Sequence, residues 1–90
     1  MGDAADFLGL SPEEAQLVEV KLALGDELRR IRLEHGWTQV QVAQKIGSSQ
    51  SRVAKMEAAD VSVSLDLVVK TLFALGTSSR DLGRVLSRSA

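Results

Sequence analysis

Hydrophobic residues recur at the spacing of a helix face in the first third of the chain. The residues on that face are Leu17, Leu24, Leu28 and Ile31. Ser11 with Glu14 three positions later forms a capping box, and Pro12 suits the first position of a helix. Gly36 is a natural stop. The pattern therefore predicts a helix of about 23 residues, roughly 35 Å long if it is unbroken.

Two features of this predicted helix leave its packing open. Gly25 lies inside it and costs about 1 kcal/mol relative to alanine, so it marks either a kink or a division into two helices. Further apolar residues lie off the main face, namely Val18, Val20 and Leu22. Because the first half of this helix is apolar on two sides, a second surface must cover its other apolar side. Either another subunit or another protein supplies it, or the segment folds back on its own core.

A short helix is expected next, over residues 39–46. Thr38 and Gln41 form a second capping box at its start. Gly47 follows the helix and can take the left-handed backbone that ends it. Ala43 is the small residue in the middle of this helix, where a larger side chain would push a neighbouring helix away.

A second short helix follows almost at once, from Gln50 to about Ala58, with Ser49 as its cap. Two helices joined so tightly must pack closely across each other. Their shared apolar face consists of Val42, Ile46, Val53 and Met56. The opposite face of the second helix is entirely polar or basic and consists of Gln50, Ser51, Arg52 and Lys55.

Two more helices complete the expected fold. Residues 60–63 form a linker, after which Ser64 caps a helix that ends near Gly76. The apolar face of that helix comprises Leu65, Val68, Val69, Leu72 and Phe73. Ser78 with Asp81 opens the last helix, whose apolar side comprises Leu82, Val85 and Leu86. The prediction is an all-α protein of about five helices.

The domain organisation follows from these elements. Residues 1–9 have no periodicity and are expected to form a flexible tail. Residues 10–24 form an N-terminal helical extension for contact with a second subunit or a partner. Residues 25–90 form a helix-turn-helix domain with its C-terminal helices. Ninety residues are enough for one domain, with a core small enough that oligomerisation would help it.

Composition excludes several classes of function. The chain has no cysteine, which rules out disulfides, thiol catalysis and cysteine-based metal sites. Its longest apolar stretches are far too short to span a membrane. Asp3 and Asp6 stand where a signal peptide would need basic charge, so no export signal is expected. A cytoplasmic location and no membrane contact fit these observations.

Charge is unevenly distributed. The net charge is −1, which by itself argues mildly against nucleic-acid binding. Residues 1–20 contain five acids and no base, whereas residues 21–60 contain seven bases and five acids and residues 61–90 four bases and two acids. The acidity is thus confined to one end of a chain that is otherwise mildly basic. Charge permits DNA binding without demonstrating it.

The stretch from Trp37 to Glu57 resembles the Cro/repressor-like helix-turn-helix family, often called the XRE family. The residues in register with that family are Thr38, Gln39, Ala43, Gly47, Val53 and Glu57. The helix expected after Ser64 is also similar to the family's next element. The resemblance covers about residues 26–83 and implies a five-helix fold like that of λ repressor.

The resemblance also implies a mode of DNA binding. The second helix of the motif would enter the major groove with its N-terminal residues facing base edges. Gln50 would be the leading base reader, because a glutamine amide can bond bidentately to adenine. Ser51 and Lys55 match further base-facing positions. Arg52 would either read guanine or hold a phosphate.

Other polar residues match supporting positions. Gln39 matches a residue that contacts phosphate and often braces the base-reading glutamine. Thr38 and Ser49 are helix caps that can also reach the DNA backbone. The preceding helix carries the run Arg29, Arg30 and Arg32. These arginines either contact phosphate or pair with Glu34, Asp26 or solvent.

Two departures from the family's pattern stand out. Many members have glycine two residues after the closing glutamate, whereas this chain has Ala59 there. The helix is therefore expected to end differently, with Asp60 taking the unusual backbone angle. The low overall charge implies that tight DNA binding depends on a homodimer or on a partner.

The leading functional hypothesis is a sequence-specific, DNA-binding transcriptional regulator of the repressor kind, acting as a homodimer on double-stranded DNA. Small chains of this kind resemble HigA-type antitoxins, and the acidic first 20 residues could face a basic toxin. A stand-alone repressor is the other reading. A protein-binding adaptor without DNA readout is the alternative from a different class, and the polar, basic face of the second helix argues against it.

An enzyme is not expected. The only histidine, His35, precedes Gly36 at a helix end, where it favours the helix dipole. The chain shows no nucleophile, no carboxylate pair with a base and no phosphate-cradling loop. We therefore expect neither a cofactor nor a metal.

Overall fold

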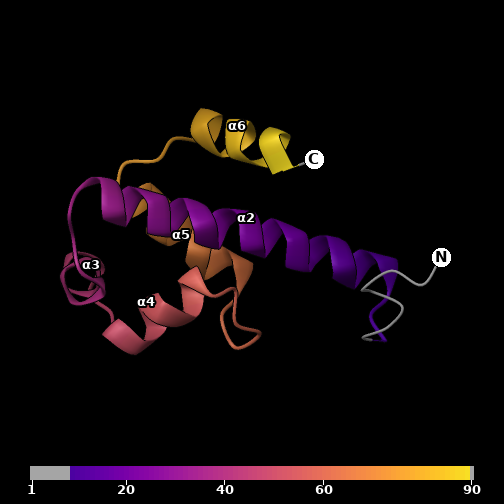
Figure 1. Ribbon diagram of the computed structural model, residues 1–90, viewed down its shortest axis with the longest axis horizontal. Coiled ribbons are helices and arrows are strands. Elements are labelled where there is room, and N and C mark those ends of the chain that lie inside the picture. Colours follow the sequence, from indigo (N-terminus) through magenta and orange to yellow (C-terminus); the bar gives the residue numbers. More distant parts are fainter. Residues whose placement is uncertain (1–8, 90) are drawn as a thin grey trace.

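The computed structural model describes residues 9–89, and over this range it contains helices and no strands. The helices are α2 (Pro12–Glu34), α3 (Gln39–Ile46), α4 (Gln50–Glu57), α5 (Leu65–Ala74) and α6 (Ser79–Ser89). Figure 1 shows α2 as the long axis of the molecule, with α3, α4 and α5 gathered around its C-terminal half and α6 alongside it. The predicted all-α class with five helices is confirmed for the described residues. The flexible tail predicted at residues 1–9 lies outside them, apart from Gly9.

Helix starts follow the capping signals of the sequence. The Ser11 hydroxyl accepts a hydrogen bond from the Glu14 amide at 3.1 Å, and the Glu14 carboxylate accepts one from the Ser11 amide at 3.1 Å. Reciprocal boxes of the same kind start α3, at Thr38 and Gln41, and α6, at Ser78 and Asp81. Ser49 and Ser64 cap α4 and α5 with single bonds. Each cap satisfies amides that a helix cannot pair internally.

Gly25 does not divide α2, which is continuous from Pro12 to Glu34. A Cβ atom at this position would lie 2.6 Å from the carbonyl oxygen of Met56 and 3.0 Å from that of Glu57. The glycine is therefore explained by the close approach of the end of α4 to α2. The sequence pattern could not show this reason, because the two segments are about 30 residues apart.

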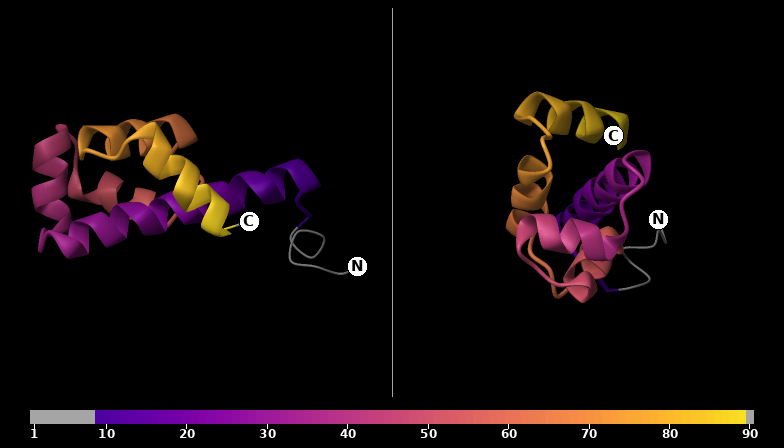
Figure 2. Two further views of the ribbon diagram at one scale, coloured as in Figure 1. Left: turned by 90° about the horizontal axis from the view of Figure 1, so that it is seen from above. Right: turned by 90° about the vertical axis from the view of Figure 1, so that its left-hand side faces the viewer.

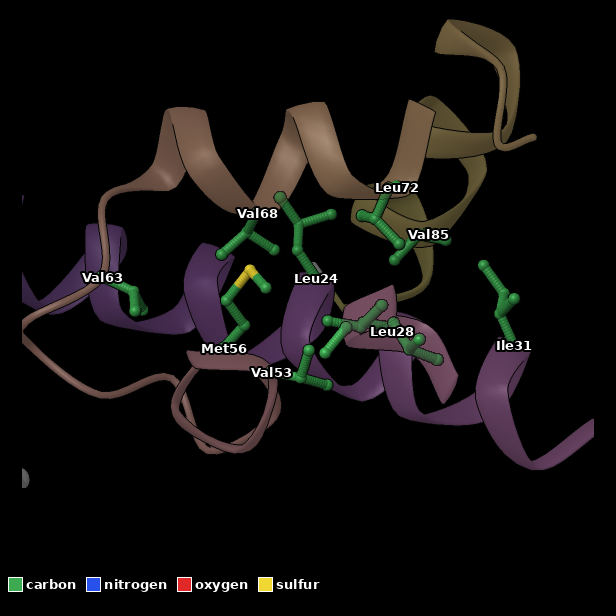
Figure 3. Close-up of a cluster of buried hydrophobic side chains, with 11 residues drawn as sticks. Leu24, Leu28, Ile31, Val53, Met56, Val63, Val68, Leu72 and Val85 are labelled. Carbon is green, nitrogen blue, oxygen red and sulfur yellow. The ribbon is translucent and has the colours of Figure 1, made fainter. Parts of the chain in front are cut away.

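The core lies between the second half of α2 and the other helices. Leu28, Val53, Met56, Val68 and Leu72 are fully buried. Figure 3 shows these side chains converging between α2, α4 and α5, with Met56 directed toward Val68. Because α4, α5 and α6 each pack against α2, while α3 packs on α4, the second half of α2 is the central helix of the fold.

Two predicted core positions are more exposed than expected. Leu17 shares a face with Leu24 but is 47% exposed, because α2 extends past the core at that point. Phe73 is 46% exposed, so it does not belong to the buried face of α5. Val68 and Leu72 form that face, and Leu65 and Val69 lie at its edge.

The end of α4 corrects one prediction. Ala59, and not Asp60, takes the left-handed backbone, with a φ of +54°. The Asp60 amide donates to the Lys55 carbonyl at 2.9 Å and the Ala59 amide to the Met56 carbonyl at 3.2 Å. These two bonds form the usual left-handed helix end, with alanine at the position that glycine adopts more favourably.

None of the helices in the described part of the chain is long and apolar enough to cross a membrane.

Candidate nucleic-acid interface

The two short helices α3 and α4 pack directly on each other. Gly47, between them, has a φ of +66° and a ψ of 40°, which is the left-handed region. Ala43 is 3% exposed, and its carbonyl accepts the Ser48 amide at 2.9 Å. A larger side chain than alanine would separate the two helices at this point. The tight turn predicted from the sequence is therefore present.

The outer and inner faces of α4 differ completely. Val53 and Met56 are fully buried, whereas Gln50, Ser51, Arg52 and Lys55 are all exposed. Neither Arg52 nor Lys55 forms a salt bridge with any described residue. Their positive charges are thus available to an external anion.

Gln50 is held by the side chain of Gln39. The Gln50 amide nitrogen, Nε2, donates to Gln39 Oε1 at 2.6 Å. A glutamine amide has two donors and one acceptor oxygen, so Gln50 keeps one donor and its Oε1 for another molecule. One donor and one acceptor side by side are what the major-groove edge of adenine requires.

Gln39 is held in turn by a buried ion pair. Its Nε2 donates to Glu57 Oε1 at 3.2 Å. Arg32 donates to the same carboxylate at 2.6 and 2.9 Å and also to the Trp37 carbonyl at 3.2 Å. The side chains of Arg32 and Glu57 are 14% and 6% exposed, and the hydrogen bond to Glu57 raises the pKa of Arg32. The ion pair therefore orients the amide of Gln39, which orients that of Gln50.

The two caps beside the motif keep part of their hydrogen-bonding capacity. Thr38 Oγ1 accepts from the Gln41 amide and Ser49 Oγ from the Arg52 amide, each at 3.1 Å. Each hydroxyl thus acts as an acceptor in the cap and retains its own proton for donation. Both residues are exposed, so a phosphate oxygen can approach them.

A groove of about 580 Å³ runs beside the outer face of α4. Its polar lining consists of Ser49, Ser51, Arg52, Lys55, Ser62 and Ser64. The groove therefore joins the N-terminal end of α5 to the exposed face of α4. The structure brings together the predicted residues of α4, and it places Thr38 and Gln39 at the adjacent start of α3.

The arginine run of α2 divides into three different environments. Arg30 bonds Glu27 at 2.7 and 2.9 Å and also contacts Glu34, as one alternative predicted. Arg29 is exposed and forms no ion pair with a described residue. The pairing of Arg32 with Glu57 was missed, because the two residues are 25 positions apart and no local spacing connects them.

The fold and this surface define a DNA-binding domain of the helix-turn-helix class. The model of a family described as a helix-turn-helix domain matches residues 23–86, well over half of the chain. The chain therefore belongs to this family, which is related to the XRE type. No curated protein and no solved structure matches the chain significantly. The match begins inside α2, and the division of the chain between residues 24 and 25 stays a prediction.

Proposed function

We propose that this protein is a sequence-specific transcriptional repressor that places the N-terminal half of α4 in the major groove of DNA. Gln50 reads adenine with its free donor and acceptor, and Ser51 and Lys55 face neighbouring bases. Arg52 bonds guanine or a phosphate. The observation that carries the proposal is the hydrogen-bonded series from Arg32 to Gln50, which presents an oriented amide on an otherwise exposed helix.

The remaining contacts position the protein and do not read sequence. Gln39, Thr38 and Ser49 lie beside α4 and supply donors for phosphate oxygens. The protein acts as a homodimer in this proposal, because two half-sites compensate for the weak charge of a single copy. We propose a cytoplasmic location and assign no catalytic activity, cofactor or metal.

The double substitution Gln50→Ala with Arg52→Ala tests base reading. We expect affinity for the promoter of the protein's own gene to fall by at least tenfold, while weak binding to scrambled DNA changes much less, as fluorescence anisotropy can measure. Arg80→Ala is the control for charge, since Arg80 is exposed on α6 and forms no salt bridge with a described residue. Unchanged promoter affinity in the double variant would show that α4 is not the reading helix.

A finer assignment is an antitoxin that neutralises a basic toxin. The observation in its favour is that Glu13, Glu14 and Glu19 are all exposed, with no basic residue before Lys21. The reading frame next to the gene tests this assignment. A small basic protein encoded there, which co-purifies with this chain and whose toxicity this chain suppresses, would support it. An unrelated neighbour would favour a stand-alone repressor.

A further inference from the structure

The first part of α2 projects beyond the other helices. We call residues 12–22 the α2 arm, and Figures 1 and 2 show it extending past the body of the molecule. Lys21 ties the base of the arm to the loop after α4, since its Nζ donates to the Asp60 carbonyl at 3.1 Å. The exposed apolar side chains of the arm are Leu17, Val18 and Leu22, at 47%, 38% and 47%.

Three residues of the arm form a seam. Ala15, Val18 and Leu22 are three and four positions apart, which places them in one row along the helix, as in two-helix packing. The same row continues to Gly25, where the end of α4 covers it. The seam is therefore the uncovered continuation of a surface that already packs against a helix.

We propose that this seam binds the seam of a second copy of the chain, with the two arms antiparallel about a two-fold axis beside Val18. In that arrangement Leu22 of each copy lies over the small Ala15 of the other. Glu14 comes beside Lys21 of the second copy, so opposite charges flank the seam. A two-fold interface of this kind is self-complementary in shape and, on the side of Glu14 and Lys21, in charge.

The position of α4 gives an independent argument from distance. Both contacts involve the C-terminal end of α4, since Met56 and Glu57 lie against Gly25 and Arg32 bonds Glu57, so this end of α4 lies beside α2 between these levels (Figure 1). At 1.5 Å per residue, Gly25 and Arg32 are about 10 and 21 Å from Val18 along the helix. Measured along the paired arms, the two copies of this end of α4 would then be about 20–40 Å apart, a range that includes the roughly 34 Å between half-sites on DNA. This step alone rests on the proposed function.

The solution mass of the full chain without DNA tests the pairing directly. Sedimentation over a concentration series should show a dimer. Leu22→Glu should raise the dissociation constant of that dimer at least tenfold, because it places a charge in the seam. Leu33→Glu is the matched control, since Leu33 is on the same helix, is 57% exposed and lies far from the arm. Circular dichroism should show that both variants remain helical.

Single cysteines identify the face, because the chain has none of its own. Val18→Cys should form a disulfide-linked dimer on mild oxidation, since the axis brings the two copies of this residue together, whereas Leu33→Cys should stay largely monomeric. A wild-type protein that stays monomeric at every concentration, or that pairs only with an added basic protein, would overturn the proposal. So would a dimer insensitive to Leu22→Glu that Val18→Cys does not link. Loss of promoter binding with the dimer intact would count against the proposed function alone.

Discussion

Along α2, Leu28 is fully buried, while Leu17, eleven residues earlier on the same face, is 47% exposed. Both are leucines in one continuous helix that begins at a sound capping box. Helix α2 meets α4, α5 and α6, and its second half carries the core leucines, whereas the arm reaches the rest of the described chain through Val20 at the edge of the core and the bond from Lys21 to Asp60. An apolar stripe thus predicts a buried face, but the neighbouring elements decide where along the helix the burial stops.

The largest difference between the two halves should appear when each leucine is truncated. We expect Leu28→Ala to lower the free energy of unfolding by about 3–5 kcal/mol, because it leaves a cavity in the core. Leu17→Ala should change it by about 0.5 kcal/mol or less, as at other exposed positions. Urea denaturation of the two variants at low protein concentration measures both values. Similar losses in the two variants would show that the arm is packed.

The arginines of α2 offer a second contrast. Arg32→Ala leaves the nearly buried Glu57 carboxylate without its ion pair, so we expect a loss of about 3 kcal/mol in unfolding free energy. Promoter affinity should also fall, since Gln39 loses the carboxylate geometry that orients it. Arg29→Ala, on the exposed side of the same helix, should leave stability nearly unchanged. Equal affinities in a folded Arg32→Ala protein would break the link from Arg32 to Gln50.

Replacing a glycine by alanine should change stability in opposite directions in α2 and in α6. Gly25→Ala forces a Cβ atom against the Met56 carbonyl, so we expect it to destabilise the protein by about 1–3 kcal/mol. Gly83→Ala meets nothing within 4 Å and should stabilise α6 by up to about 1 kcal/mol through helix propensity. Thermal unfolding of the two variants compares them. A stabilising Gly25→Ala would mean that α4 does not approach α2 so closely.

Low pH should destabilise the packing of the second half of α2 by protonating Glu27. The hydrogen bond from Arg30 lowers the pKa of Glu27. Glu27 is 7% exposed and also faces Arg88 on α6. A carboxyl with a pKa lowered by folding stabilises the protein above its unfolded value and loses that contribution as pH falls through the folded one. Stability should therefore fall below about pH 4.5. Glu27→Gln should make this decline in stability shallower, and we expect this change in unfolding free energy to be the smallest of the four predicted here.

That acid dependence has three further sources, which the variant separates. The pKa values of Glu14, Asp60 and Asp81 are also lowered, by hydrogen bonds from the backbone amides of Ser11, Ser62 and Ser78. Because these bonds do not involve Glu27, their contribution should persist in Glu27→Gln. A variant with the same pH profile as the wild type would show that the Glu27 pairs do not stabilise the contact between α2 and α6.

The sequence by itself determined the helix starts and the register of the helix-turn-helix. Ser11, Thr38, Ser49, Ser64 and Ser78 each act on an amide three residues away, so their signals are complete within one helical turn. The same holds for the left-handed Gly47 and for the polar outer face of α4. These features depend on neighbours in the chain and can be predicted without knowing the fold.

Only the tertiary structure decided the contacts between distant segments. The packing of α4 against α2 explains why position 25 must be glycine. The lack of a helix beside the start of α2 in the described part of the chain explains why Leu17 is exposed. Helix packing also pairs Arg32 with Glu57 across 25 positions and connects Gln39 to that pair. The polar outer face of α4 can thus be predicted from the local sequence. The orientation of Gln50 on that face depends on the buried carboxylate of Glu57, which only the packing of the helices brings into place.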